Sequence, residues 1–186
     1  RQMRWLFRKA LAPKENWEPE ARRKDLVERL WLIAAIEHYT AILGDFALNN
    51  TWREHGADPA MTDLFTWHGA EEVEHRSVAH DVATYFGDGY IRRARAMAVA
   101  LFGLLMLLHR GSRFIAKSDP YRKYSYLSMW TEYRRGAKAG VLPTLRSIIL
   151  ATFSYFRPSF RPEEIGSTAQ AVAYLASSPA TRAAAP

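Results

Sequence analysis

Residues 67–75 read Trp67-His68-Gly69-Ala70-Glu71-Glu72-Val73-Glu74-His75, and this stretch decides both the fold and the chemistry expected of the chain. At about 100° per residue, His68, Glu71, Glu72 and His75 fall on one side of a helix. The same side carries apolar residues, namely Met61, Leu64, Phe65, Val78, Ala79, Val82 and Phe86. The pattern predicts ionisable groups buried on an apolar stripe, and such groups are costly to bury unless a partner neutralises them.

A metal cation is one such partner. Glu72-x-x-His75 has the spacing of ligand pairs in the carboxylate metal sites of helical bundles, because side chains three residues apart reach one ion from adjacent turns. Taken alone the pattern is weak, since Glu72 could equally form an i,i+4 ion pair with Arg76 on a surface helix. A second acid on the preceding helix is needed to make it specific.

Glu37 supplies that acid. It interrupts a stretch, residues 30–48, that is apolar on nearly every side and is expected to be buried on all faces. Its neighbours at helical spacing include small residues, among them Gly44, which leave room beside the carboxylate. The alternative is a buried acid paired with an arginine such as Arg76 or Arg110.

These residues are assigned roles as follows. We predict Glu37, Glu72 and His75 as metal ligands. Glu71 is predicted to act as general base toward water, although it could replace Glu72 as a ligand or support a ligand from behind. His68 is predicted to orient a ligand or polarise the substrate, with direct ligation as the alternative. Two other residues are expected to stay outside the site, Glu74 as a solvated charge and His38 as a core or interface histidine.

Helix signals dominate the rest of the chain, and strand signals are almost absent, so we predict an all-α fold. Capping residues, prolines and glycines place helices at about 19–48, from Asp58-Pro59 to residues 87–89, at 90–116, from Asp119-Pro120 to 135, and at 143–156. At most one short helix is expected after Ser167. We therefore expect a single helical metal-binding domain over residues 1–165, followed by an Ala/Ser-rich tail over 166–186.

Composition narrows the chemistry. The 186 residues are 48% hydrophobic and 13% aromatic, which indicates a globular protein with a sizeable core. There is no cysteine, which excludes thiolate metal sites, iron–sulfur clusters, disulfides and cysteine nucleophiles. A metal must therefore use nitrogen and oxygen ligands, which suits iron, manganese or zinc. No nucleophile-elbow motif and no glycine-rich phosphate loop occur.

The formal net charge is +7, with basic residues spread in doublets rather than in one dense patch. Solvated helix faces are the expected explanation, and attraction to an anionic membrane surface or an acidic partner is the alternative; no nucleic-acid-binding signature is present. The apolar run 96–108 is shorter than the about 20 residues that cross a bilayer, so we expect a buried helix there, or an interfacial one because basic residues flank it. No signal peptide is visible, and a cytoplasmic or membrane-associated location is expected.

The motif residues resemble a family of bacterial proteins described as predicted metal-dependent hydrolases with a ferritin-like helical architecture. The resemblance rests on residues 35–41 (Ala-Ile-Glu-His-Tyr-Thr-Ala), on residues 67–82, and on residues 155–162 (Tyr-Phe-Arg-Pro-Ser-Phe-Arg-Pro). It extends to about Pro162, although Arg161 stands where the family favours a histidine.

The resemblance implies a ferritin-like bundle, with the C-terminal helices as additions to it. It also implies a further helical portion upstream that would supply another glutamate and another Glu-x-x-His pair. This chain starts after that portion and so holds half of a two-metal ligand set. Two half-sets could meet in a homodimer, or the upstream helices could belong to a longer protein.

Together these observations predict a metal-dependent hydrolase that uses one or two divalent ions to activate water against a small-molecule substrate. A di-iron oxidase or oxygenase would use the same ligands for redox chemistry. A non-enzymatic helical protein at the membrane periphery is the third hypothesis, and the run 96–108 between basic flanks is the feature that favours it.

Overall fold

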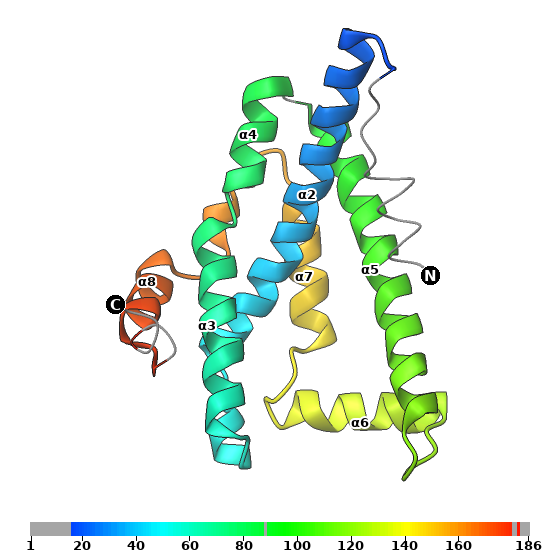
Figure 1. Cartoon of the computed structure of the whole chain (residues 1–186), viewed down its shortest axis with the longest axis vertical. Coiled ribbons are helices and arrows are strands. Elements are labelled where there is room, and N and C mark those ends of the chain that lie inside the picture. The colour runs from blue at the N-terminus through cyan, green and yellow to red at the C-terminus, as the bar shows by residue number, and fades with distance from the viewer. Residues whose placement is uncertain (1–15, 88, 180–181, 183–186) are drawn as a thin grey trace.

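The computed structural model describes residues 16–87, 89–179 and 182, and these residues form helices, turns and loops with no strand (Figure 1). The all-α prediction is confirmed. The α-helices are α2 (Pro19–Leu48), α3 (Pro59–His75), α4 (Val78–Gly87), α5 (Tyr90–Ser118), α6 (Tyr126–Lys138), α7 (Leu145–Tyr155) and α8 (Thr168–Ser177), with 3-10 turns at Trp52–His55 and Pro162–Glu164.

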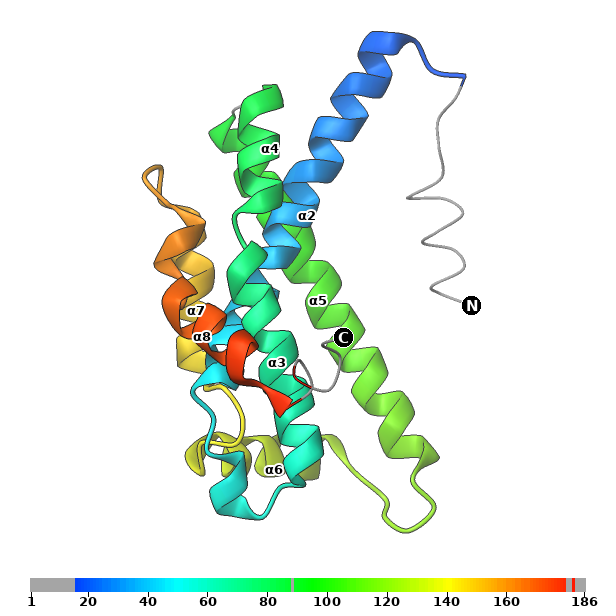
Figure 2. The ribbon, with the colours of Figure 1, turned by 60° about the vertical axis from the view of Figure 1, so that its left-hand side comes forward.

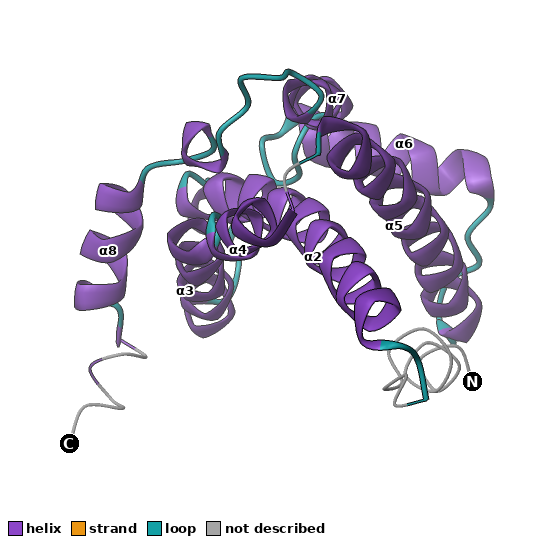
Figure 3. Ribbon diagram, turned by 90° about the horizontal axis from the view of Figure 1, so that it is seen from above, coloured by secondary structure: helices purple, strands orange, loops and turns teal. Residues whose placement is uncertain are grey.

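Helix α2 is the centre of the fold, and it packs against α3, α4, α5 and α7. Seen from above, α3 and α8 lie on one side of α2, and α5 lies on the other (Figure 3). The core forms around the buried side chains Trp31, Tyr39, Met97, Tyr155 and Phe160. The apolar stripe of α2 therefore holds together helices that are distant in sequence.

Some helix starts follow the capping signals of the sequence and others differ. Helix α7, expected to open at Pro143, begins at Leu145 after the Thr144 cap. Asp58 caps α3 by accepting the Met61 N–H at 2.9 Å, as the Asp-Pro signal predicts. The prediction that Asp119-Pro120 opens a helix is wrong. The Asp119 carboxylate instead accepts the N–H groups of Tyr121 (2.8 Å) and Arg122 (3.1 Å), which holds a turn. Helix α6 begins only at Tyr126, after a capping box on Ser125.

The prediction of one continuous helix from residue 59 to about residue 87 is also wrong, because a turn at Arg76-Ser77 interrupts the helix. Arg76 is buried, and its guanidinium donates to the carbonyls of Val73, Pro162 and Glu163 and to the Thr168 hydroxyl. The first turn of α4 is satisfied separately, since the Glu37 carboxylate accepts the Ala79 N–H at 3.3 Å. Long-range partners on both sides of the break thus replace the local bonds of a continuous helix.

Helix α8, which lies in the Ala/Ser-rich segment, packs along α3 (Figure 2). Ala171 is buried against Ala70 and Val73, and the Tyr174 hydroxyl donates to the Asp63 carboxylate at 2.7 Å. Residues 168–177 are therefore the one short helix that was expected after Ser167, and it packs on α3.

The expectation that 96–108 lies in a buried helix holds only for its beginning. Ala96, Met97 and Ala100 are buried, but Phe102 and residues 105–108 are exposed. None of the described helices combines the length and the apolar character needed to cross a membrane.

Candidate metal site

The site is positioned by a glycine contact between α2 and α3. A Cβ at Gly44 would lie 2.4 Å from the Gly69 carbonyl oxygen, and a Cβ at Gly69 would lie 2.9 Å from the Gly44 oxygen and from the Ala47 Cβ. Only hydrogen fits at both positions, so the two backbones touch. Gly69, a glycine inside the helical motif 67–75, is the sequence signal for this contact, which was not predicted.

This contact sets the relative heights of the motif residues. Helices α2 and α3 run in opposite directions along each other (Figure 1). Glu37 lies seven residues before Gly44, and His75 lies six residues after Gly69. At 1.5 Å per residue, both are displaced by about 9–10 Å from the contact toward the same end. Glu37 and His75 therefore come to similar levels on neighbouring helices. Glu72 lies nearer the glycine contact, since a Cβ at Gly44 would be 3.2 Å from the Glu72 Cβ.

The Glu37 carboxylate is half-buried and sits in a mixed electrostatic field. Burial raises the pKa of Glu37, and the hydrogen bond from the Ala79 N–H opposes that rise. The charge of His75 also lowers this pKa, whereas the charge of Glu72 raises it. The charges of both other predicted ligands therefore act on the pKa of Glu37. The alternative of an ion pair with Arg76 fails, because the Arg76 guanidinium bonds to backbone carbonyls and Thr168.

On α3, His68 lies between the two acids that follow it. Its Nε2 is 3.4 Å from Glu72 Oε1, and its Nδ1 is 3.9 Å from Glu71 Oε2. The Glu72 side chain is 16% exposed, and that of His68 is 60% exposed. Glu72 is thus more sheltered than the His68 imidazole that lies beside it.

The expectation of a dry, buried stripe is wrong for these residues. His68 and His75 are exposed. So are apolar residues of the same face, which are Met61, Leu64, Phe65, Val78, Val82 and Phe86, together with Ile33, Ile36 and Leu43 on α2. The physical reason is that α2, α3 and α4 cover one another along one side only, and the motif side looks outward. Across residues 16–87, 89–179 and 182, no three His, Asp or Glu side chains form a group that could hold a metal ion. The ligand set stays a prediction.

The residues expected to lie outside the site do so. Glu74 is exposed, and His38 is buried among Tyr39, Tyr155 and Phe160. The His38 Nε2–H donates to the Ala151 carbonyl at 2.9 Å, and burial lowers the pKa of His38 to about 4. His38 is therefore a neutral core histidine at physiological pH.

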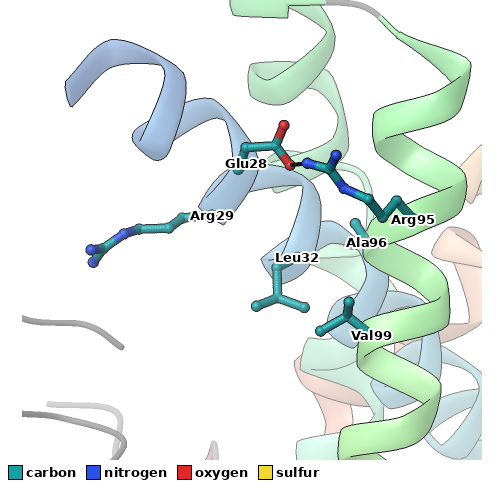
Figure 4. A pocket seen from close by; sticks show the side chains of 6 residues that line it. All are labelled: Glu28, Arg29, Leu32, Arg95, Ala96 and Val99. Atoms are coloured by element: carbon teal, nitrogen blue, oxygen red, sulfur yellow. Dashed lines mark hydrogen bonds and ion pairs between the residues drawn. The ribbon is translucent and has the colours of Figure 1, made fainter. Parts of the chain in front are cut away.

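Two pockets flank α2. One, of about 260 Å³, lies between α2 and α5 and is closed on one side by the 2.7 Å ion pair of Glu28 with Arg95 (Figure 4). The other, of about 740 Å³, is lined by apolar side chains that include Leu30, Ile33 and Phe86, and also by three arginines, Arg22, Arg23 and Arg29. Ile33 precedes Glu37 by one helical turn, so this larger pocket begins beside the candidate site.

The fold and this face define an all-α helical protein with a carboxylate and imidazole motif on two antiparallel helices. The profile of a family described as "Predicted metal-dependent hydrolase" matches residues 3–166, and the chain belongs to that family. No curated protein and no solved structure matches the chain.

Proposed function

We propose that this chain is a metal-dependent hydrolase whose ligands to a divalent cation are Glu37, Glu72 and His75. The observation that carries the proposal is the contact of Gly44 with Gly69, which brings Glu37 and His75 to similar levels on the antiparallel helices α2 and α3. The Glu37 carboxylate is half-buried there, and the negative charge of Glu72 raises its pKa. Two carboxylates in a partly desolvated place repel each other, and a divalent cation relieves that repulsion. The donor set, two oxygens and one imidazole nitrogen, suits iron, manganese or zinc.

Glu71 and His68 have separate roles in the proposed reaction. A divalent cation held by Glu37, Glu72 and His75 would supply Lewis-acid activation of water. Glu71 would act as the general base, taking a proton from the attacking water at a carboxylate oxygen and returning it to the leaving group. His68, which lies 3.4 Å from Glu72 and 3.9 Å from Glu71, orients the Glu72 carboxylate and keeps Glu71 in place. The pocket beside Ile33, with its apolar side chains and arginines, supports a small-molecule substrate with an apolar part.

Metal content tests the ligands directly. The wild type and a Glu72→Ala/His75→Ala variant are purified in parallel, dialysed, and compared by elemental analysis and by calorimetric titration with Mn²⁺ and Zn²⁺. Glu74→Ala is the matched control, because Glu74 is an exposed acid of the same helix. We expect the double variant to lose the bound ion and the control to keep it. Equal metal content in all three proteins would remove the proposed site.

The reaction class needs a separate measurement. Chromogenic carboxylic and phosphate esters are tested with the metal-loaded protein, and Glu71→Gln is expected to slow hydrolysis by about 10²–10⁴-fold with unchanged metal content. Bound iron together with dioxygen consumption by the reduced protein, and no ester cleavage, would instead assign the redox chemistry of di-iron oxidases or oxygenases.

We also propose that two copies of the chain complete the site. Two-metal sites in ferritin-like bundles take one glutamate from each of two helices and one Glu-x-x-His pair from each of two others. Glu37 and Glu72-x-x-His75 are one of each, so a two-fold axis beside them would supply the full set. The exposed apolar side chains around these ligands, such as Ile36 and Val78, would then be covered.

Light scattering and metal stoichiometry test this assembly. A metal-loaded dimer with one ion per chain is expected, and Ile36→Asp should give a monomer without stoichiometric metal. A monomeric Ile36→Asp protein that still binds its ion would refute the shared site but keep the ligands.

A further inference from the structure

We propose that the corner formed by the end of α5, the following loop and α6 docks on an anionic membrane surface. This corner is defined as residues 101–138. Helix α6 lies across the end of the molecule, crosswise to α5 and α7 (Figures 1 and 2). The proposal concerns this surface alone and does not depend on the metal site.

Apolar side chains on this corner face solvent. Helix α5 has no buried residue after Ala100, and α6 has none at all. Phe114, Ile115 and Leu127 are each at least 70% exposed. Exposed apolar side chains that gather on one part of a surface are typical of an interaction site.

Positive charge surrounds these apolar residues. Residues 101–140 contain eight arginines and lysines but only two acids, Asp119 and Glu132, a difference that accounts for most of the formal net charge of +7. Glu132 pairs with Arg122 and Arg135. Among the described residues Arg113, Lys117 and Lys123 form no ion pair, so their charges are available to lipid phosphates.

The corner is also rich in aromatic residues with polar edges, which favour the boundary between headgroups and acyl chains. Tyr121 is almost fully exposed, and Tyr126 and Trp130 are about half exposed. Tyr126 also fixes the corner, because His109 stacks on its ring and the Arg113 guanidinium lies 5.0 Å from the ring centroid. A crosswise amphipathic helix with basic and aromatic residues is the arrangement of helices that lie in the membrane interface.

A second copy of the chain is a poorer occupant of this face. Self-association through the corner would bring its arginines and lysines against the same residues of the partner, and juxtaposed like charges oppose binding. An anionic bilayer provides both the complementary charge and an apolar layer for Phe114, Ile115 and Leu127.

Vesicle co-sedimentation tests the proposal with the full chain. We compare vesicles of phosphatidylcholine with vesicles containing phosphatidylglycerol, at about 0.1 M and about 0.5 M salt. Binding is expected to be at least about tenfold stronger on the anionic vesicles and to fall steeply at high salt. Equal binding to both vesicle types, or to neither, would overturn the proposal.

Two variants separate charge from apolar insertion. Lys117→Glu/Lys123→Glu should reduce binding by about tenfold or more, whereas Arg23→Glu/Arg161→Glu, which changes the net charge equally on exposed residues elsewhere, should retain most of it. Phe114→Ser/Leu127→Ser should also reduce binding, against Tyr85→Ser/Ile91→Ser as the apolar control. All eight side chains are exposed, so the helical circular dichroism should not change.

Two outcomes of this series would refute the lipid surface. One is equal loss of binding in a variant pair and its control. The other is self-association in solution that Phe114→Ser/Leu127→Ser abolishes, without vesicle binding by the wild type, which would assign the face to a second copy.

Discussion

Gly44 of α2 and Gly69 of α3 meet backbone to backbone, since a Cβ at Gly44 would stand 2.4 Å from the Gly69 carbonyl oxygen. No side-chain movement can relieve that clash, because the atom in the way belongs to the main chain. The register of the two helices, and with it the height of Glu37 beside His75, depends on this pair.

Replacing either glycine should separate the helices. We expect Gly44→Ala to lower the free energy of unfolding by about 1–3 kcal/mol, as overpacking does, despite the better helix propensity of alanine. Gly103→Ala on α5 is the matched control, because a Cβ there meets nothing within 4 Å. The control should gain about 0.5–1 kcal/mol. Urea denaturation of both proteins checks the result, and two equal shifts would contradict the close contact.

The double role assigned to Glu37 can be separated by two substitutions. Glu37→Gln keeps an oxygen that can accept the Ala79 N–H but removes the charge, so in chelator the melting temperature should stay equal or rise. Glu37→Ala removes the acceptor as well and should cost about 1 kcal/mol, as loss of a helix cap does. Neither variant should show the rise in melting temperature that a bound divalent ion gives the wild type. A metal-induced rise in Glu37→Gln equal to that of the wild type would exclude Glu37 as a ligand.

Stability should fall as the pH falls from about 6.5 toward 4 because of His38. The unfolded chain takes up a proton near the ordinary pKa of 6.5, whereas burial holds the folded pKa of His38 at about 4. The unfolded state therefore binds more protons in this window, and each pH unit costs up to about 1.4 kcal/mol. The lowered pKa of His80 acts in the same direction, and the raised pKa of Glu37 acts in the opposite one.

His38→Gln isolates this contribution, because its amide can still donate to the Ala151 carbonyl. The variant should show a shallower decline in unfolding free energy between pH 6.5 and 4 than the wild type. His55→Gln changes an exposed histidine and should keep the wild-type slope. Unfolding at several pH values measures both, and identical slopes in all three proteins would contradict a neutral His38.

Arg76 should be among the most sensitive positions of the fold. The residue is 4% exposed, and its guanidinium donates to the carbonyls of Val73, Pro162 and Glu163 and to the Thr168 hydroxyl. Arg76→Lys leaves several of these acceptors without a donor and should cost about 2–4 kcal/mol. Arg146→Lys, at an exposed position, should be neutral. Limited proteolysis near residues 163–168 should accelerate only in the Arg76 variant, and equal cleavage of both would argue against its role in docking α8.

The features of the fold that depend on local chemistry could be predicted from the sequence. The bounds of α2 follow from Pro19 and the Asn49-Asn50 stop, and the start of α3 follows from the Asp58 cap. The class of the fold follows from the helical spacing of the apolar residues. The position of His38 in the core could also be predicted, since the residue lies off the Glu37 side of its helix.

Contacts between segments that are distant in the sequence could not be predicted from the sequence. The interruption between α3 and α4 depends on hydrogen bonds from Arg76 to Pro162 and Thr168. No residue pattern within 67–82 predicts this interruption. The helix expected from Asp119 fails because the Asp119 carboxylate holds a turn that starts no helix. The exposure of His75 was missed for a further reason: spacing predicts which residues share a side of a helix, but not whether another element covers that side.

The hydrogen bond from Ala79 to Glu37 joins the start of α4 to the candidate ligand. A cation bound at that carboxylate would withdraw electron density from the oxygen that accepts the amide, so ion binding and helix initiation would be thermodynamically linked. The deuterium exchange rate of a single main-chain amide, that of Ala79, would then report occupancy of the site without any knowledge of the substrate.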